Sequence, residues 1–250
     1  MARVDYTASA GTYRAARTLP PEILAPWSAA IARARLPHPD LVLDVGAGPG
    51  GFVAPLADWF AAPVVPVEPS AAMRDEARAA GIIPGRTYVG AWAEALPFRA
   101  GSADLAWLST VIHQCDDRSA ALAELRRVVR PDGRVLVRGY FGDMAPSGMF
   151  SYFPGAERSA ATFPTTTAIT TEFAAAGFTL AAVHDVVEPW RPTLAGWIAH
   201  VQRMHDVDSA LRPLHADEIA EGIRRVTYAY RDLDGRLPHD TTIRLLVFGA

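Results

Sequence analysis

Two hydrophobic patterns alternate along this chain. Short, nearly continuous apolar runs are typical of strands that are buried on both faces of a parallel sheet. They occupy residues 41–45, 64–67, 87–90, 104–110, 134–140, 178–187 and 242–248. Between them, apolar residues recur every three or four positions and predict helices over residues 20–35, 52–60, 71–80, 117–129 and 168–176. This alternation predicts a doubly wound α/β fold with a mostly parallel, seven-stranded sheet.

The pattern is interrupted twice in the second half of the chain. Residues 142–167 are rich in Gly, Pro, Ser, Thr and aromatic side chains, so we expect a loop with one short helix there. Residues 190–236 are mainly helical and precede the last predicted strand. We expect one domain over residues 1–250, with an N-terminal cover helix in residues 1–36 and a helical insert at about 190–236. The insert is either a lid over a substrate or a structural appendage.

Composition narrows the class of protein. Half of the 250 residues are apolar, and 24 basic against 27 acidic residues give a net charge of −3, without the basic excess of nucleic-acid-binding proteins. Cys115 is the only cysteine, so no intrachain disulfide can form and a reducing, cytoplasmic setting is expected. No run approaches the roughly 18 apolar residues that cross a bilayer. We expect a cytoplasmic monomer or homodimer that binds neither nucleic acid nor a membrane.

A glycine-rich turn follows the first predicted strand. Gly46, Gly48 and Gly51 have the spacing of a dinucleotide-binding turn, where missing Cβ atoms let a ligand approach the backbone. The helix behind the turn offers free N–H groups to polar ligand atoms. Glu68 ends the second strand, where a carboxylate can accept hydrogen bonds from both hydroxyls of a ribose. The combination predicts a site for an adenosine-containing cofactor without identifying which one.

Five segments resemble, in order, the motifs of class I S-adenosylmethionine-dependent methyltransferases, in the small-molecule group with the ubiquinone-biosynthesis-type core. They are residues 43–50 (LDVGAGPG), 67–73 (VEPSAAM), 91–98 (AWAEALPF), 104–113 (DLAWLSTVIH) and 124–136 (ELRRVVRPDGRVL). Asp44, two positions before the first glycine, is unusual in dehydrogenases. The resemblance does not extend to any diagnostic motif in residues 142–236.

The resemblance implies S-adenosylmethionine as cofactor and S-adenosylhomocysteine as product. Asp44 would orient the ammonium group of the cofactor, Glu68 would hold its ribose, and Trp92 would border its adenine. Many relatives carry an acid at the position of Trp92, so stacking, Ala93 or Glu94 would have to replace its contact with the adenine amino group. The cofactor-binding residues predicted in this way are Arg17, Asp44, Gly46, Ala47, Gly48, Gly50, Glu68, Pro69, Met73, Trp92, Ala93, Glu94 and Ser109.

The residues before the first strand also have a counterpart in the family. Tyr6, Tyr13 and Arg17 resemble an N-terminal element that covers the cofactor in relatives. Arg17 could pair with the cofactor carboxylate, or it could lie in solvent.

His113 is the candidate catalytic base. It follows the fourth predicted strand, at the edge where open α/β sheets bind ligands, and imidazole exchanges protons near neutral pH. It could instead bond a loop carbonyl or line the substrate pocket, where Gln114 could also contact substrate. His200 and His205 have a poor spacing for one metal ion, so we expect no metal. Aromatic residues of the insert fit either an apolar substrate pocket or the insert's own core.

The function expected from these observations is methyl transfer to O, N or C of a small molecule, for instance in secondary metabolism. One alternative is a protein that binds S-adenosylmethionine without transferring its methyl group. The other is a nicotinamide-dependent oxidoreductase that shares the glycine turn. Asp44 and the absence of a Ser/Tyr/Lys catalytic set disfavour it.

Overall fold

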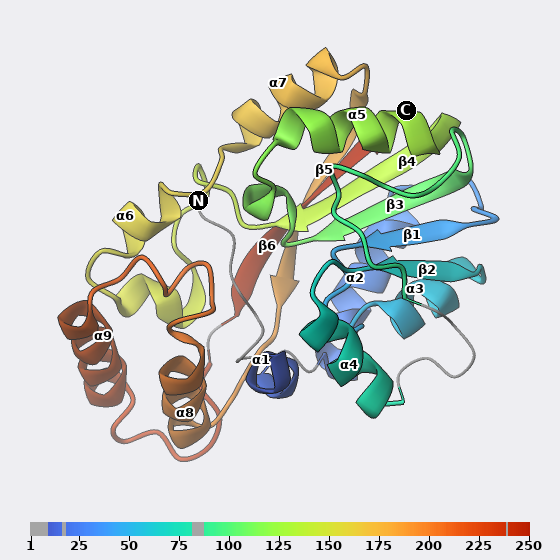
Figure 1. The fold of residues 1–250 in the computed structure, drawn as a ribbon. Coiled ribbons are helices and arrows are strands. Elements are labelled where there is room, and N and C mark those ends of the chain that lie inside the picture. The colour runs from blue at the N-terminus through green and yellow to red at the C-terminus, as the bar shows by residue number, and fades with distance from the viewer. Residues whose placement is uncertain (1–9, 17–18, 82–87, 239) are drawn as a thin grey trace.

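The sheet of this protein has its parallel strands on one side and an antiparallel pair on the other. A computed structural model describes residues 10–16, 19–81, 88–238 and 240–250. Within them, six strands are β1 (Val42–Val45), β2 (Val64–Val67), β3 (Ala103–Ser109), β4 (Val129–Gly139), β5 (Thr179–Glu188) and β6 (Thr241–Gly249). Their order is β2-β1-β3-β4-β6-β5. Strands β2, β1, β3 and β4 are parallel, and β6 is antiparallel to both β4 and β5 (Figure 1).

The seventh strand expected at residues 87–90 is not confirmed. Val89 forms a single parallel bridge with Val67. Its N–H donates to the carbonyl of Pro66 at 2.9 Å, and its carbonyl accepts from the N–H of Glu68 at 3.0 Å. The described part of this segment therefore lies beside β2, at the edge of the sheet, but is too short to count as a strand. Thr87 lies outside the described residues.

Strand β4 begins earlier than the sequence pattern predicts. The sequence pattern predicts this strand over residues 134–140, whereas β4 starts at Val129 and includes residues 131–133. Val129 pairs with Ala103 and Arg134 with Leu105, so the register against β3 shifts between these two pairs. Asp132 takes a φ of +69° at this irregularity. The strand is longer than predicted because the Pro-Asp-Gly sequence is accommodated as an irregularity within a continuous strand.

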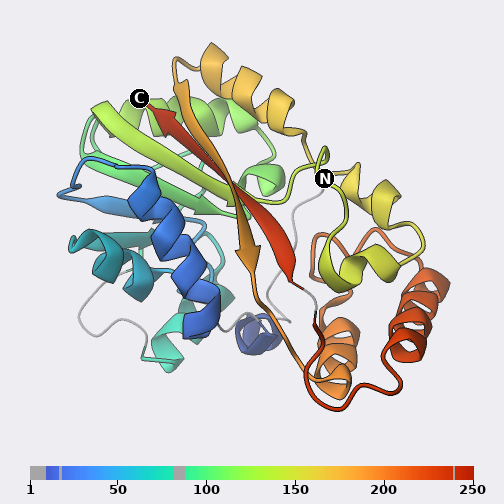
Figure 2. The ribbon, with the colours of Figure 1, turned by 180° about the vertical axis from the view of Figure 1, so that it is seen from behind.

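Helices cover both faces of the sheet. Their bounds are α1 (Ala10–Ala16), α2 (Pro21–Arg33), α3 (Val53–Phe60), α4 (Ala71–Ala79), α5 (Arg118–Val128), α6 (Ala156–Ala160), α7 (Thr166–Ala175), α8 (Leu194–Met204) and α9 (Ala216–Ala229), with 3₁₀ turns η1 (Ile112–Gln114) and η2 (Gly148–Tyr152). On one face, α3 packs against β2 and α2 against β5, in one apolar cluster with Val42 of β1. On the other, α5 packs against β4 and α7 against β5, in a cluster that includes the neighbouring Leu43 (Figures 1 and 2). Burial on both faces explains the continuous apolar runs of the strands.

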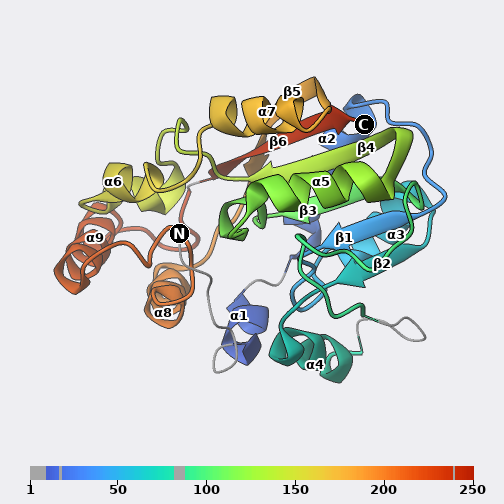
Figure 3. The same cartoon turned by 45° about the horizontal axis from the view of Figure 1, so that its top comes forward.

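The expected cover helix at residues 1–36 divides into two helices with different neighbours. Trp27 of α2 is fully buried in the core beneath the sheet, so α2 belongs to the helical layer. α1 contacts α4 and α8 instead (Figure 3). α2 begins at Pro21 with Pro20 as its N-cap, because the fixed φ of proline suits the first turn of a helix.

A third apolar cluster lies apart from the sheet and joins two distant segments of the chain. Met149 and Phe153, in and directly after η2, pack with Trp197 and Val201 of α8. A Cβ atom on Gly222 of α9 would lie 2.4 Å from the Phe153 ring, which shows how closely α9 approaches this segment. We call η2, α6, α8 and α9 the cap (Figure 1). The expected loop at residues 142–167 therefore contains two short helices, which pack with the 190–236 insert. Within the described residues, no helix has the length and apolar character needed to cross a membrane.

Candidate functional site

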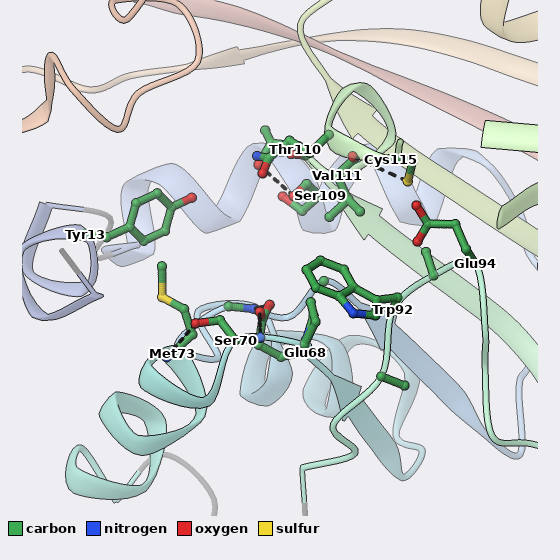
Figure 4. A pocket seen from close by; sticks show the side chains of 16 residues that line it. Tyr13, Glu68, Ser70, Met73, Trp92, Glu94, Ser109, Thr110, Val111 and Cys115 are labelled. Atoms are coloured by element: carbon green, nitrogen blue, oxygen red, sulfur yellow. Dashed lines mark hydrogen bonds between the residues drawn. The ribbon is translucent and has the colours of Figure 1, made fainter. Parts of the chain in front are cut away.

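A pocket opens where the glycine turn after β1 meets the ends of β2 and β3. The space between its walls, including the part open to solvent, is about 770 Å³. We call it the glycine-turn pocket (Figure 4). It is lined by Tyr13, Gly46, Gly48, Glu68, Pro69, Ser70, Met73, Ala91, Trp92, Ala93, Glu94, Ser109, Thr110, Val111, Gln114 and Cys115.

Most residues predicted from the sequence to bind the cofactor line this pocket together. They are Gly46, Gly48, Glu68, Pro69, Met73, Trp92, Ala93, Glu94 and Ser109. Asp44, Ala47 and Gly50 are absent from the wall. The N–H of Ala47 donates to Val67 and the N–H of Gly50 donates to Ala47, so these two residues build the turn from within. Arg17 and Tyr6 lie outside the described residues.

The two glycines of the wall are required for different reasons. Gly46 has a φ of +73°, and a Cβ atom there would lie 2.3 Å from Cγ2 of Val111. Gly48 has a φ of +55°, but a Cβ atom there would meet nothing within 4 Å. Gly46 thus allows the turn to approach the loop after β3. Gly48 leaves open space beside the backbone, into which a ligand can fit.

Glu68 is held by the turn on one side and by α4 on the other. Its Oε2 accepts the N–H of Gly48 at 2.9 Å, and its Oε1 accepts the N–H of Ser70 at 2.8 Å. Burial raises the pKa of this carboxyl, while the two N–H donors and Arg74 act in the opposite direction. Because a carboxylate can accept about four hydrogen bonds, Glu68 retains acceptor capacity toward the pocket.

Asp44 is a buried acid with one carboxyl oxygen that has no hydrogen-bond partner among the described residues. Its side chain is only 2 % exposed, and its Oδ2 accepts no hydrogen bond from the part of the chain that the structure describes. Burial, and secondly the neighbouring Glu68 carboxylate, raise the pKa of Asp44 to about 8. A buried acceptor without a donor is costly, so this atom points to a cationic or hydrogen-bond-donating partner supplied from outside the chain.

Three side chains from separate segments surround the same space (Figure 4). Trp92 is 48 % exposed, which is unusual for so large an apolar ring. The buried Met73, at the start of α4, and Tyr13 of α1 lie on the opposite side of the pocket (Figure 4). Tyr13 was associated with the cofactor only through the family's N-terminal element.

A second and larger pocket lies between the strand ends and the cap. Its space is about 1550 Å³, and we call it the cap pocket. Tyr13, Thr110 and Gln114 also line the glycine-turn pocket, so the two pockets share a wall. The other residues that line the cap pocket are Leu19, Ile23, His113, Arg138, Tyr140, Ser147, Met149, Phe150, Phe153, Phe163, Glu188, Trp190, Trp197, His200, Val201, Val207, Asp208, Ser209, Ala210, Leu211, Thr241 and Ile243.

His113 lines the cap pocket and not the glycine-turn pocket. It is buried in η1, and its Nε2 lies 3.0 Å from Oγ of Ser209 in the loop between α8 and α9. Its ring centre is 4.9 Å from that of Phe163. These contacts fix the orientation of the imidazole at the side of the cap pocket nearest to β3.

Thr110 stands in the shared wall with a strained backbone. Its φ of +57° is a left-handed conformation, which is rare for a β-branched residue. Its N–H donates to the carbonyl of Arg138 at 2.7 Å, and its own carbonyl accepts from Nε2 of Gln114 at 3.2 Å. Such strain costs about 1–3 kcal/mol and persists only where the surroundings impose it, often at a functional site.

The sequence interpretation missed a buried ion pair in the wall of the cap pocket. Arg138 of β4 and Glu188 at the end of β5 are joined by a charge-assisted hydrogen bond, with both side chains largely buried. A signal was present, because Arg138 directly follows the apolar run of residues 135–137. Its partner could not be identified, since Glu188 lies 50 positions further along the chain.

Residues 43–137 of this chain match the family model described as a methyltransferase domain. Dimethylglycine N-methyltransferase of Parasynechococcus marenigrum is 37 % identical over 102 residues, which are 39 % of this chain and 36 % of that protein. Malonyl-[acyl-carrier protein] O-methyltransferase of Erwinia billingiae is 41 % identical over 97 residues, 38 % of this chain and 37 % of that protein. The chain thus spans well under half the length of these curated relatives.

Solved structures resemble more of the chain. The YcgJ protein of Bacillus subtilis has a TM-score of 0.59 at 17 % identity, covering 90 % of this chain and 97 % of that one. A SAM-dependent methyltransferase of Aquifex aeolicus has a TM-score of 0.55 at 17 % identity, covering 66 % and 85 %. At this level of identity, the likeness establishes the Rossmann-like methyltransferase fold alone.

Proposed function

We propose that this chain, whose residues 43–137 match a methyltransferase domain, is a class I S-adenosylmethionine-dependent methyltransferase that transfers the methyl group of this cofactor to an O, N or C nucleophile of a small molecule. The acceptor occupies the cap pocket, next to the cofactor in the glycine-turn pocket. The observation that carries the proposal is the shared wall of the two pockets at Tyr13, Thr110 and Gln114. Two ligands on either side of this wall can approach each other closely.

The residues of the glycine-turn pocket fit the cofactor. The open space beside Gly48 suits a ligand chain that lies against the backbone. The unpaired Oδ2 of Asp44 suits the ammonium group of the methionine part, through direct contact or through water. Glu68 has the remaining acceptor capacity for the ribose hydroxyls, and the exposed ring of Trp92 suits the adenine.

The bound cofactor supplies an electrophilic methyl group on a sulfonium sulfur. The protein's own task is therefore to hold the acceptor in line with the bond that breaks and to exclude water. Positioning of this kind lowers a barrier by roughly 7–11 kcal/mol in favourable cases. Where the acceptor must lose a proton, Nε2 or Nδ1 of His113 is the group in the cap pocket suited to accept it, for about 10²–10⁴-fold in rate.

One observation favours a second function, binding of the cofactor without methyl transfer. His113 Nε2 already interacts with Ser209, so this atom has to exchange partners before it can accept a proton. In that case the chain would be a cofactor-binding protein with an inactive cap pocket.

Calorimetry followed by a transfer assay tests the proposal. We expect S-adenosylhomocysteine to bind with micromolar affinity and NAD not to bind. Transfer of a labelled methyl group from S-adenosylmethionine to a library of small molecules then separates the enzyme from the binding protein. Absence of S-adenosylhomocysteine binding would refute both functions, and binding without transfer to any library member would favour the second.

A further inference from the structure

Glu188 offers one carboxylate oxygen to the cap pocket. Its Oε1 accepts hydrogen bonds from Nε1 of the buried Trp27 at 2.6 Å and from Nη2 of Arg138. Its Oε2 accepts none from the described residues, and the side chain is 12 % exposed in the wall of the pocket. The carboxylate is therefore fixed through one oxygen and remains available through the other.

The guanidinium of Arg138, next to Glu188, is engaged by other protein groups. Arg138 is paired with Glu188, and its Nη1 donates to Oγ of Ser109 at 3.1 Å. Its guanidinium carbon lies 4.7 Å from the ring centre of Trp27. Among the described residues that line the cap pocket, Arg138 is the only Arg or Lys. Nε of Arg138 has no partner among the described residues but is itself buried. A carboxylate on the ligand would therefore meet a guanidinium that Glu188 already neutralises, whereas a hydrogen-bond donor has Glu188 Oε2.

The remaining wall of the cap pocket is rich in aromatic rings. They are Tyr140, Phe150, Phe153, Phe163, Trp190 and Trp197. Rings that surround a space from several elements favour a flat apolar ligand, because stacked and edge-on contacts add to the gain from burial.

Glu188 is also connected to the proposed cofactor site. It bonds Arg138, and Arg138 bonds Ser109, which lines the glycine-turn pocket, so two hydrogen bonds separate Glu188 from that site.

We propose that the cap pocket binds an aromatic molecule whose amine or hydroxyl group donates a hydrogen bond to Glu188 Oε2. The identification of this molecule as the methyl acceptor rests on the proposed function, but its binding does not. Dimethylglycine and malonyl groups, which the names of two relatives mention, are small and carboxylate-bearing. Acceptors of that kind lack the ring that this pocket favours.

Three indole compounds that differ in one group test the proposal. Tryptamine carries an ammonium group, tryptophol a hydroxyl group and indole-3-acetate a carboxylate on the same ring. We expect tryptamine or tryptophol to bind the intact protein at least tenfold more tightly than indole-3-acetate in calorimetry. Equal or tighter binding of indole-3-acetate, or no binding of any of the three at millimolar concentration, would overturn the proposal.

Substitutions on β5 connect this preference to Glu188. Glu188→Gln removes the charge with little change in shape, and we expect it to weaken binding of the preferred compound about ten- to hundredfold. Asp185→Asn is the matched control, because it removes an exposed carboxylate of the same strand that pairs with Arg244 outside the pocket. Unchanged affinity in folded Glu188→Gln would refute the anchor. The selectivity of the unaltered protein tests the proposal even if that variant does not fold.

S-adenosylhomocysteine binding, measured on the same samples, keeps the two proposals separate. If the protein binds S-adenosylhomocysteine but does not prefer tryptamine or tryptophol over indole-3-acetate, the proposed acceptor class alone is contradicted. Intact indole preference without S-adenosylhomocysteine binding would contradict the proposed function alone.

Discussion

His113 and Ser209 meet across the cap pocket, with Nε2 of the imidazole 3.0 Å from Oγ of the serine. His113 belongs to the turn after β3, and Ser209 to the loop between α8 and α9. One hydrogen bond therefore connects the carboxyl end of the sheet with the cap, beside the wall that the two pockets share. The same imidazole is the proposed base, so its roles in catalysis and in holding the cap have to be separated by experiment.

Substitution of the two partners separates these roles. We expect His113→Asn to lower kcat by about 10²–10⁴-fold if the acceptor must be deprotonated. Its affinity for S-adenosylhomocysteine should not change, because His113 does not line the glycine-turn pocket. Ser209→Ala should leave kcat within a few-fold of the unaltered protein. Equal losses in the two variants would indicate that only the connection to the cap matters.

Removal of the Glu68 carboxylate should weaken cofactor binding. Hydrogen bonds to a charged group contribute about 1.5–3 kcal/mol each, so Glu68→Ala should raise the Kd for S-adenosylhomocysteine at least tenfold. Asp75→Ala is the control, because Asp75 is an exposed acid of α4 that pairs with Arg78. Calorimetry measures both variants, and an unchanged Kd in Glu68→Ala would dismiss the ribose assignment.

Substitution of Gly46 by alanine should mainly lower stability, whereas substitution of Gly48 should mainly weaken cofactor binding. Gly46→Ala should destabilise the fold by about 1–3 kcal/mol, because the new methyl group overlaps with Val111. Adding Val111→Ala should recover part of that loss. Gly48→Ala should cost only about 1 kcal/mol of backbone strain but raise the Kd for S-adenosylhomocysteine more than tenfold. Urea unfolding and calorimetry measure these quantities, and full cofactor affinity in Gly48→Ala would contradict the binding geometry.

Asp44 should make stability depend on pH. Its pKa in the folded protein is about 8, well above the value of an unfolded chain, so the folded state holds a proton that the unfolded state has lost. This contribution is fully present below about pH 4 and is lost as pH rises through 8. Between pH 6 and pH 9, the free energy of unfolding should fall by about 3 kcal/mol more in the unaltered protein than in Asp44→Asn.

The proposed contact with an ammonium group provides an independent measurement on Asp44. A cation beside the carboxylate lowers its pKa, so S-adenosylhomocysteine binding near pH 7 should release up to about one proton. Calorimetry in buffers of different ionisation enthalpy measures this release. Its persistence in Asp44→Asn would show that the proton comes from another group.

The glycine turn and its acidic partner could be predicted from the sequence, because each is formed by residues that are close together in the chain. The Gly46–Gly51 turn follows a buried strand directly, and Glu68 ends the next strand, so parallel pairing alone brings them to the same edge of the sheet. The alternation of strand and helix patterns similarly predicted the doubly wound architecture. The seventh strand expected at residues 87–90 is not confirmed, because the length of a strand depends on a neighbouring strand that the local pattern does not reveal.

The sequence by itself determined the glycine turn, its acidic partner and the order of the elements, since each depends on contacts between short, adjacent segments. Only the tertiary structure decided that residues 148–160 pack with α8 and α9, that His113 faces the cap pocket, and that Arg138 meets Glu188. These pairings join residues far apart in the chain. They follow from how the strands and the cap pack in space, and no spacing in the sequence encodes them.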